Sequence, residues 1–248
     1  KGKRIYLSVL NCFSQSIRQL ETIKMMNDDP LFNKYFLSPR PEDFKIRKAP
    51  NVIGNSFLKP KQIQAVENSA QLTASQEPEI LIIHGPPGTG KTHTIISIVR
   101  KHFEDYEIRR SKIPFAQEPS ILICAPSNIA LDVIGKRILE EKYFDKLKFF
   151  TKFPKFIRLG IKKKTDPKLH KYHVKDLILT ERCSKRQLFN NASIVLSTLN
   201  SSQPAYKSDR KFDLVIIDEA GQCSEPELLM PFIYRPNTVI LLGDHHQL

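Results

Sequence analysis

Long apolar runs are missing from this chain of 248 residues, and cysteine is rare. No stretch approaches the ~18 consecutive apolar residues that a membrane-spanning helix needs, and the first residues lack the apolar segment of a signal peptide. We therefore expect no membrane association. The four cysteines are scattered without a Cys-x-x-Cys pair. Their spacing argues against zinc and favours free thiols in a reducing compartment.

An octapeptide of the form Gly-x-x-x-x-Gly-Lys-Thr is the most informative motif present. It consists of Gly85, Pro86, Pro87, Gly88, Thr89, Gly90, Lys91 and Thr92. Apolar residues 80–83 before it predict a strand and residues 92–99 after it predict a helix, which is the context of a phosphate-binding loop. The glycines permit a tight turn with inward N–H groups, Lys91 adds a positive charge, and the Thr92 hydroxyl suits Mg²⁺. The alternative is a Gly/Pro-rich turn that happens to contain lysine. The context favours a loop that binds a nucleoside triphosphate.

Short apolar segments alternate with helical ones over the rest of the chain. Strands are predicted at residues 120–125, 156–159, 193–197, 214–218 and 238–242. None of them alternates polar with apolar residues, which is typical of strands covered on both faces. Helices such as the one predicted over residues 129–142 fall between several of the strands. This order predicts an α/β domain with a mainly parallel sheet, whose ligands gather at the carboxyl ends of the strands.

The N-terminal part of the chain differs from this pattern. Apolar residues at helical spacing predict an amphipathic helix over residues 5–26, and a short helix follows at residues 31–37. Prolines and a glycine indicate an irregular linker over residues 38–56. A helix with Pro60 in its first turn then opens the next unit.

We divide the chain into a helical stalk with a linker, residues 1–56, and an α/β domain, residues 57–248. Residues 141–190 form a basic insertion with fifteen Lys or Arg against five Asp or Glu, in a chain of net charge +13. A solvated face is the ordinary explanation of a charge run. Its concentration in a nucleotide-binding protein favours a polyanion such as nucleic acid. The chain begins at Lys1 and stops at Leu248 directly after an apolar segment, so we expect a fragment.

A pair of acids, Asp218 and Glu219, ends another predicted strand. In an enzyme with a phosphate-binding loop, the first acid holds Mg²⁺ and the second orients or deprotonates the attacking water. The alternative is an acidic turn that caps the following helix. Downstream of a complete loop we favour the catalytic interpretation. At the end of the last strand, Asp244 and Gln247 are expected to reach the γ-phosphate or its water.

Other strand-end and upstream residues have both a functional and an ordinary interpretation. Gln62 can donate to and accept from adenine, or it can face solvent. Pro126, Ser127 and Asn128 end one predicted strand, and Thr198 ends another. Short hydroxyl and amide side chains suit the phosphates of a single-stranded nucleic acid. They suit helix caps equally well.

Taken together, these segments resemble superfamily 1 helicases of the Upf/senataxin group. The matching elements are, in order, residues 58–66, 85–92, 125–132, 197–199, 218–222 and 243–248. Residues 156–160 and 174–180 look like the senataxin branch, whereas residues 223–228 look closer to the nonsense-mediated decay helicase. The first helix is similar to the stalk before the first RecA-like domain of this group. The resemblance therefore implies a RecA-like domain with helices on both faces of its sheet.

The resemblance also implies ATP and Mg²⁺ as cofactors and a role for each candidate residue. The residues implied to contact the nucleotide are Gln62, the loop of residues 85–92 and Gln222, and those implied to hold Mg²⁺ are Thr92 and Asp218. The implied catalytic residues are Lys91, Asp218, Glu219 and Gln247. The residues implied to contact the nucleic-acid backbone are Pro126, Ser127, Asn128 and Thr198. Gln222 and Gln247 are the implied sensors of the γ-phosphate.

Members of the group move 5′ to 3′ on single-stranded RNA or DNA and unwind duplexes. The resemblance thus implies a helicase whose second RecA-like domain, the source of a catalytic arginine, is missing here, and this chain alone should not unwind a duplex. The group often inserts a helical subdomain where residues 181–192 leave little room, which keeps open a non-unwinding clamp switched by ATP. A P-loop ATPase that acts on proteins is a third hypothesis. We expect a monomer in the nucleus, with the cytoplasm as the alternative.

Overall fold

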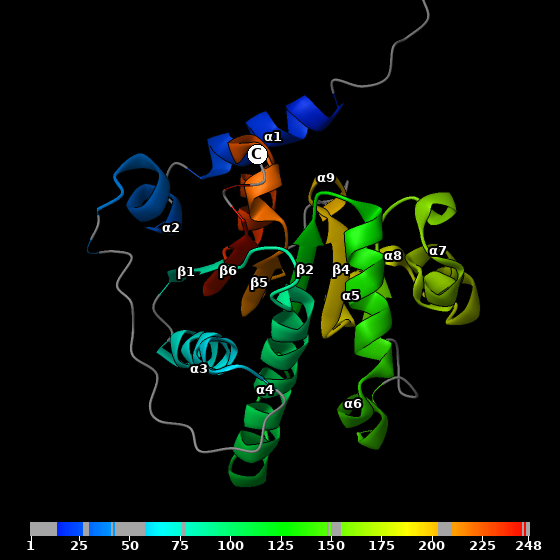
Figure 1. Cartoon of the computed structure of the whole chain (residues 1–248). Helices are drawn as coiled ribbons and strands as arrows, with labels where there is room; N and C mark the ends of the chain where they lie inside the picture. The colour runs from blue at the N-terminus through cyan, green and yellow to red at the C-terminus, as the bar shows by residue number, and fades with distance from the viewer. Residues whose placement is uncertain are drawn as a thin grey trace, which may run out of the picture.

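The computed structural model describes residues 14–26, 30–40, 42, 58–75, 78–147, 149, 155–202, 210–244 and 246. Six strands form one parallel sheet in the order β1-β6-β5-β2-β4-β3 (Figure 1). They are β1 (Glu79–His84), β2 (Ile121–Ala125), β3 (Phe156–Arg158), β4 (Ile194–Thr198), β5 (Leu214–Ile217) and β6 (Thr238–Gly243). Each strand lies where an apolar segment predicted one, so the α/β class with a parallel sheet is confirmed.

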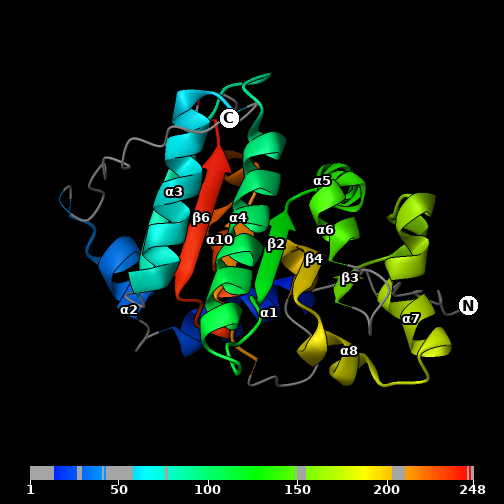
Figure 2. The same cartoon turned by 90° about the horizontal axis from the view of Figure 1, so that it is seen from below.

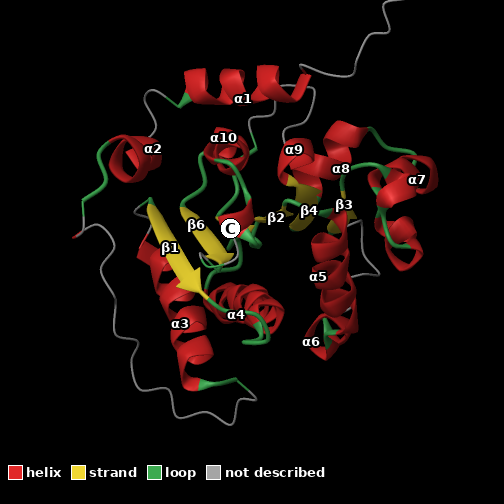
Figure 3. Cartoon of the chain, turned by 45° about the horizontal axis from the view of Figure 1, so that its top comes forward, coloured by secondary structure: helices red, strands yellow, loops and turns green. Residues whose placement is uncertain are grey.

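Helices cover both faces of this sheet (Figure 3). One face carries α3 (Pro60–Ser75), α4 (Lys91–Lys112), α5 (Asn128–Glu140) and α6 (Lys142–Lys146). The other carries α1 (Ser14–Met25), α8 (Lys185–Asn191), α9 (Leu199–Ser202) and α10 (Glu225–Leu229). At the two ends of the sheet, α2 (Pro30–Phe32) lies near β1 and α7 (Val174–Thr180) lies beyond β3. Short segments of other helix types are η1 (Asn33–Leu37), η4 (Lys162–Lys164), η5 (Pro167–Tyr172), η6 (Ala220–Gln222) and η7 (Met230–Tyr234).

The buried side chains form two apolar layers, one on each face of the sheet. Leu122 and Cys124 of β2 pack into one layer, while Ile121 and Ile123 pack into the other. Because both faces are covered, a central strand needs apolar residues at every position, which explains the runs without alternation. The edge strand β1 differs, since its Ile82 is 57% exposed.

The N-terminal helices pack on the sheet. Figure 2 shows α1 on the side of β6 opposite to α3 and α4, and α1 contacts α10 and η7. The Tyr35 hydroxyl donates to Glu79 at the start of β1, at 2.5 Å. α1 confirms the described part of the helix predicted over residues 5–26, whose first nine residues lie outside the described residues, as does most of the linker 38–56. The division of the chain into two units stays a prediction.

Within the described ranges, no helix combines the length and the apolar character that crossing a membrane requires.

Candidate active site

The carboxyl ends of the six strands meet at one edge of the sheet, and most candidate residues lie along it. β1 leads into the phosphate-binding loop, β6 leads to Asp244 and β5 leads to Asp218. These three strands are neighbours in the sheet. The adjoining strands β2 and β4 lead to Asn128 and Thr198. The edge therefore has a nucleotide half and a second half that carries the expected nucleic-acid contacts.

The phosphate-binding loop joins β1 to α4. Gly88 and Gly90 have φ angles of 72° and 86°, which residues with a Cβ rarely adopt. No described side chain caps α4, so the N–H groups of its first turn remain available to an anion at the positive end of the helix. Lys91 Nζ donates to the carbonyl of Gly85 at 2.9 Å. The loop and its lysine thus form a site for phosphate oxygens.

Asp218 is a buried carboxylate with an unused oxygen. The residue is 5% exposed, and its Oδ1 has no hydrogen-bond partner in the described part of the chain. Burial, reinforced by the charge of Glu219, raises the pKa of Asp218 to about 6. A buried oxygen without a partner is costly, and a divalent cation would satisfy it. Asp218 and the hydroxyl of Thr92 are oxygen ligands of the kind that Mg²⁺ prefers, so the residues fit this ion.

Glu219 follows Asp218 in a left-handed backbone conformation, with φ 53° and ψ 40°. This conformation costs on the order of 1 kcal/mol for a residue with a Cβ and occurs often at functional sites. Its carboxylate lies 3.4 Å from Nζ of Lys91, whose side chain is 11% exposed. The loop lysine therefore holds the candidate base at the place where phosphates would bind.

Gln62 of α3 lies half-buried against the phosphate-binding loop. Its Nε2 donates to the carbonyl of Thr89 at 3.0 Å, and its Oε1 accepts from the N–H of Lys59 at 2.8 Å. A Cβ at Gly90 would come within 2.7 Å of Nε2. The glycine is thus needed both for its φ angle and for the approach of Gln62. The contact of Gln62 with adenine stays a prediction.

The expected sensors of the γ-phosphate are described only in part. Gln247 lies outside the described residues, and Gln222 is exposed at the end of η6. Asp244 is 4% exposed and accepts from Nε2 of His84 and the backbone N–H of His246, both at 3.1 Å. The hydrogen bond from the N–H of His246, together with the His84 contact, holds the pKa of Asp244 below its usual value against the opposing effect of burial.

The four expected nucleic-acid residues come together because β2 and β4 pair in parallel. Ala125 lies opposite Thr198, so Pro126 and Ser127 follow directly beside the end of β4. The Ser127 Oγ accepts from the N–H of Ala130 at 3.1 Å and caps α5. The ordinary interpretation therefore holds for this oxygen. Contact with a nucleic acid stays a prediction for Pro126, Ser127, Asn128 and Thr198.

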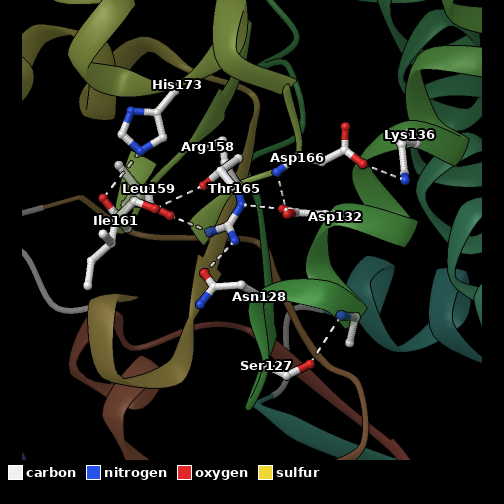
Figure 4. Close-up of polar contacts among 12 residues, drawn as sticks. Ser127, Asn128, Asp132, Lys136, Arg158, Leu159, Ile161, Thr165, Asp166 and His173 are labelled. Atoms are coloured by element: carbon white, nitrogen blue, oxygen red, sulfur yellow. Dashed lines mark hydrogen bonds and ion pairs between the residues drawn. The ribbon is translucent and has the colours of Figure 1, made fainter. Parts of the chain in front are cut away.

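A buried arginine on β3 is the main feature that the sequence did not single out. Arg158 is fully buried, pairs through Nε with Asp132 Oδ1 at 3.0 Å, and donates through Nη2 to Asn128 Oδ1 at 2.8 Å (Figure 4). Burial lowers the pKa of Arg158, against the opposing effect of Asp132. A charged residue inside an apolar strand was the available signal, since such a residue is buried only with partners.

Part of the positive charge of residues 141–190 is already paired. Lys162 lies 2.5 Å from Asp176, and Lys155 forms an ion pair with Glu118. Among the exposed lysines that form no ion pair within the described ranges are Lys163, Lys164, Lys168, Lys171 and Lys175. They follow β3 on η4, η5 and α7. A group of exposed lysines therefore lies next to the nucleic-acid half of the edge.

A phosphate-binding loop between a parallel strand and a helix, with acids on the neighbouring strands, defines a P-loop nucleotide-binding domain. The AAA_11 family model, described as an AAA domain, matches residues 58–186 and 175–248. The chain belongs to this family, and its relatives identify it as the first RecA-like domain of a Upf1-like superfamily 1 helicase. The expected family is thereby confirmed.

Three relatives whose names call them helicases come from Schizosaccharomyces pombe and Arabidopsis thaliana. The chain is 30% identical over 225 residues to ATP-dependent helicase upf1 of Schizosaccharomyces pombe, covering 78% of this chain and 24% of the relative. It is 26% identical to Probable helicase MAGATAMA 3 of Arabidopsis thaliana, covering 99% and 40%. It is 28% identical to DNA polymerase alpha-associated DNA helicase A of Schizosaccharomyces pombe, covering 79% and 33%. The chain thus spans less than half the length of each of these relatives.

Proposed function

We propose that this chain is the nucleotide-binding half of an ATP-dependent helicase that moves 5′ to 3′ along single-stranded RNA or DNA. The observation that carries the proposal is the order of the strands. Residues suited to a nucleotide follow β1, β6 and β5, and residues suited to a nucleic-acid backbone follow the adjoining β2 and β4. β5 pairs directly with β2. A movement of the acids that follow β5, caused by nucleotide binding, can therefore shift the residues that follow β2.

Binding of ATP changes the partners of Lys91 in this proposal. The loop N–H groups and Lys91 hold the phosphates, so the lysine is drawn away from Glu219. Glu219 is then free to accept a proton from the attacking water. Thr92 and Asp218 would hold Mg²⁺, which neutralises charge on the phosphates when it is bound. The ion pair between Lys91 and Glu219 thus keeps the base occupied until the nucleotide arrives.

The proposal includes a second RecA-like domain outside these 248 residues. Its arginine would stabilise the transferring phosphoryl group, an effect worth roughly 10³–10⁵ in rate. The direction of movement, the monomeric state and the nuclear location also belong to the proposal and rest on the family resemblance. The free thiols of Cys124, Cys183 and Cys223 suit the nucleus and the cytoplasm alike, since both are reducing.

ATP turnover by the full-length protein, with and without single-stranded RNA or DNA, tests this proposal. We expect a single strand to raise kcat, and we expect Lys91→Ala to abolish turnover. The matched control is Lys112→Ala, which removes an exposed lysine from the far end of α4. Turnover that no single strand stimulates, or that survives Lys91→Ala, would contradict the proposal.

One observation favours a second candidate, a clamp that is switched by ATP and does not unwind. Residues 181–192 contain only the short helix α8, where the resemblance leads us to expect a longer helical subdomain. A strand-displacement assay on the full-length protein separates the two candidates. ATP-dependent displacement supports the helicase, whereas ATP-dependent binding without displacement supports the clamp.

A further inference from the structure

The buried cluster around Arg158 joins two segments that are far apart in the sequence (Figure 4). Arg158 lies on β3, while Asn128 and Asp132 lie one turn apart on α5. The guanidinium also donates to the carbonyl of Leu159, so each of its nitrogens has a partner. The adjacent Gly160 has φ 124°, and a Cβ there would come 3.3 Å from Nη1 of the arginine. The cluster therefore requires a glycine beside it.

The arginine determines which way the Asn128 amide faces. A guanidinium can only donate hydrogen bonds, so the amide must turn its oxygen toward Arg158. The amide nitrogen then points away from the arginine, as Figure 4 shows. Asn128 is half-buried and lies in the first turn of α5, the positive end of a helix of 13 residues. Donors in this position suit the oxygens of a phosphate.

We infer that Arg158 is a positioning residue that presents the Asn128 amide as a hydrogen-bond donor to the backbone of the bound single strand. The inference rests on the proposed function, since it assumes a nucleic acid at this edge of the sheet. Arg158 is fully buried and does not itself touch the ligand. It acts through Asn128, whose amide oxygen accepts the hydrogen bond from Nη2.

The same arginine also stabilises the basic segment beyond β3. Asp132 receives the guanidinium on Oδ1 and the backbone N–H of Asp166 on Oδ2, at 2.8 Å. Asp166 is the N-cap residue of η5, and its Oδ1 accepts from the N–H of Lys168 at 2.9 Å. The ion pair between Arg158 and Asp132 thus connects the amide donor to the segment that carries the exposed lysines. The buried guanidinium of Arg158 thus positions the Asn128 amide relative to the exposed lysines of the segment beyond β3.

Binding of fluorescently labelled oligouridylate and oligothymidylate to the full-length protein tests the inference through a double-mutant cycle. Asn128→Ala should weaken binding about threefold to tenfold, the effect of removing one hydrogen bond. Arg158→Lys retains the charge for Asp132 but lacks the planar fork that also reaches Asn128, so it should weaken binding to a similar extent. In the Asn128→Ala background, Arg158→Lys should cause little further loss. A purely structural role would give the same loss in both backgrounds and would overturn the inference.

Two further variants keep the test decisive if Arg158→Lys folds poorly. Asn128→Asp keeps an oxygen for Arg158 but offers no N–H to a phosphate, so it should melt at or above the wild-type temperature and bind oligonucleotides at least about tenfold more weakly. Lys155→Met, which removes an ion pair with Glu118 at the other end of β3, should bind as wild type does. Wild-type affinity in Asn128→Asp overturns the inference and leaves the proposed function intact. Absence of binding by the wild-type protein contradicts both.

Discussion

At the scale of single residues, the site is defined by three ionisable side chains that affect one another electrostatically. Lys91 bridges the phosphate-binding loop and Glu219, and Asp218 lies directly before Glu219, just after the end of β5. The lysine neutralises one acid, while the other has a raised pKa and an oxygen without a partner in the described part of the chain. These are properties of a site built to receive a cation and phosphates.

Replacing the candidate base separates binding from hydrolysis. Glu219→Gln removes the proton acceptor and keeps the size of the side chain, so kcat for ATP should fall by about 10²–10⁴ while ATP still binds. Steady-state turnover and equilibrium binding of a labelled nucleotide measure the two quantities. Glu225→Gln, on the exposed first turn of α10, is the matched control and should leave kcat unchanged. Turnover that persists in Glu219→Gln would assign the base elsewhere.

The raised pKa of Asp218 predicts how stability depends on pH. Between about pH 4 and pH 6 the folded protein holds a proton that the unfolded chain has released, so the free energy of unfolding should fall as the pH rises through this window. Asp218→Asn carries no charge at any pH. Near neutral pH, without metal or nucleotide, it should therefore be more stable than wild type by on the order of 2–3 kcal/mol.

Thermal melting over this pH range, in the presence of a chelator, measures the effect. The advantage of Asp218→Asn should shrink toward about pH 4, where the wild-type carboxyl is protonated in both states. Asp145→Asn, on the exposed surface of α6, should behave as wild type does. An advantage that is the same at both ends of the range would show that the charge of Asp218 is not its source.

At the scale of secondary-structure elements, α3 and η4 each add side chains to one half of the sheet edge. α3 supports the phosphate-binding loop through Gln62, and η4 carries two of the exposed lysines beyond β3. The pattern of apolar strands predicts neither the contact of Gln62 with the loop nor the position of the lysines on η4. Each of these depends on one or two side chains of a helix that lies beside the sheet.

Removing the amide of Gln62 tests its two roles separately. Gln62→Ala should weaken both ATP and GTP because the loop no longer receives the hydrogen bond at Thr89. The loss of affinity should be larger for ATP, because the proposed adenine contact disappears as well. Competition binding of the two nucleotides measures the ratio. An equal loss of affinity for ATP and GTP would show that Gln62 does not contact adenine. An unchanged affinity for GTP would show that Gln62 does not stabilise the loop.

Charge reversal on η4 tests the basic surface. Lys163→Glu with Lys164→Glu should weaken single-strand binding and reduce the slope of log K against log salt by about 0.7 for each phosphate that the variant no longer neutralises. Lys162 is omitted because it is paired with Asp176. The control is Lys211→Glu, an exposed lysine before β5 at the opposite, amino end of the sheet. An unchanged slope would show that these lysines do not bind the strand.

The sequence predicted most of the elements, for a physical reason. Strands covered on both faces need continuous apolar runs, and all six runs are strands in the structure. Long-range polar contacts could not be predicted in the same way. The pairing of Arg158 with Asp132, and the contact of Gln62 with the loop, depend on how α5 and α3 lie against the sheet, and no short-range pattern encodes that geometry.

At the scale of the whole molecule, the account depends on the proximity of the two halves of one sheet edge. The phosphate-binding loop and its acids occupy β1, β6 and β5, and the proposed single-strand contacts continue on β2 and β4. The sequence predicted the members of both halves but could not supply the strand order, which places β5 between β6 and β2. In this order, binding of a nucleotide at the first half can alter the position of the single-strand contacts at the second half.

The central claim is this coupling, and the affinity of the full-length protein for single-stranded RNA with and without a non-hydrolysable ATP analogue tests it most directly. Linkage requires the analogue to change the affinity for RNA by the same factor as RNA changes the affinity for the analogue, and couplings between sites are typically about 5–150-fold. We predict a reciprocal change of at least about fivefold. Equal affinities for RNA at zero and at saturating analogue would contradict the account.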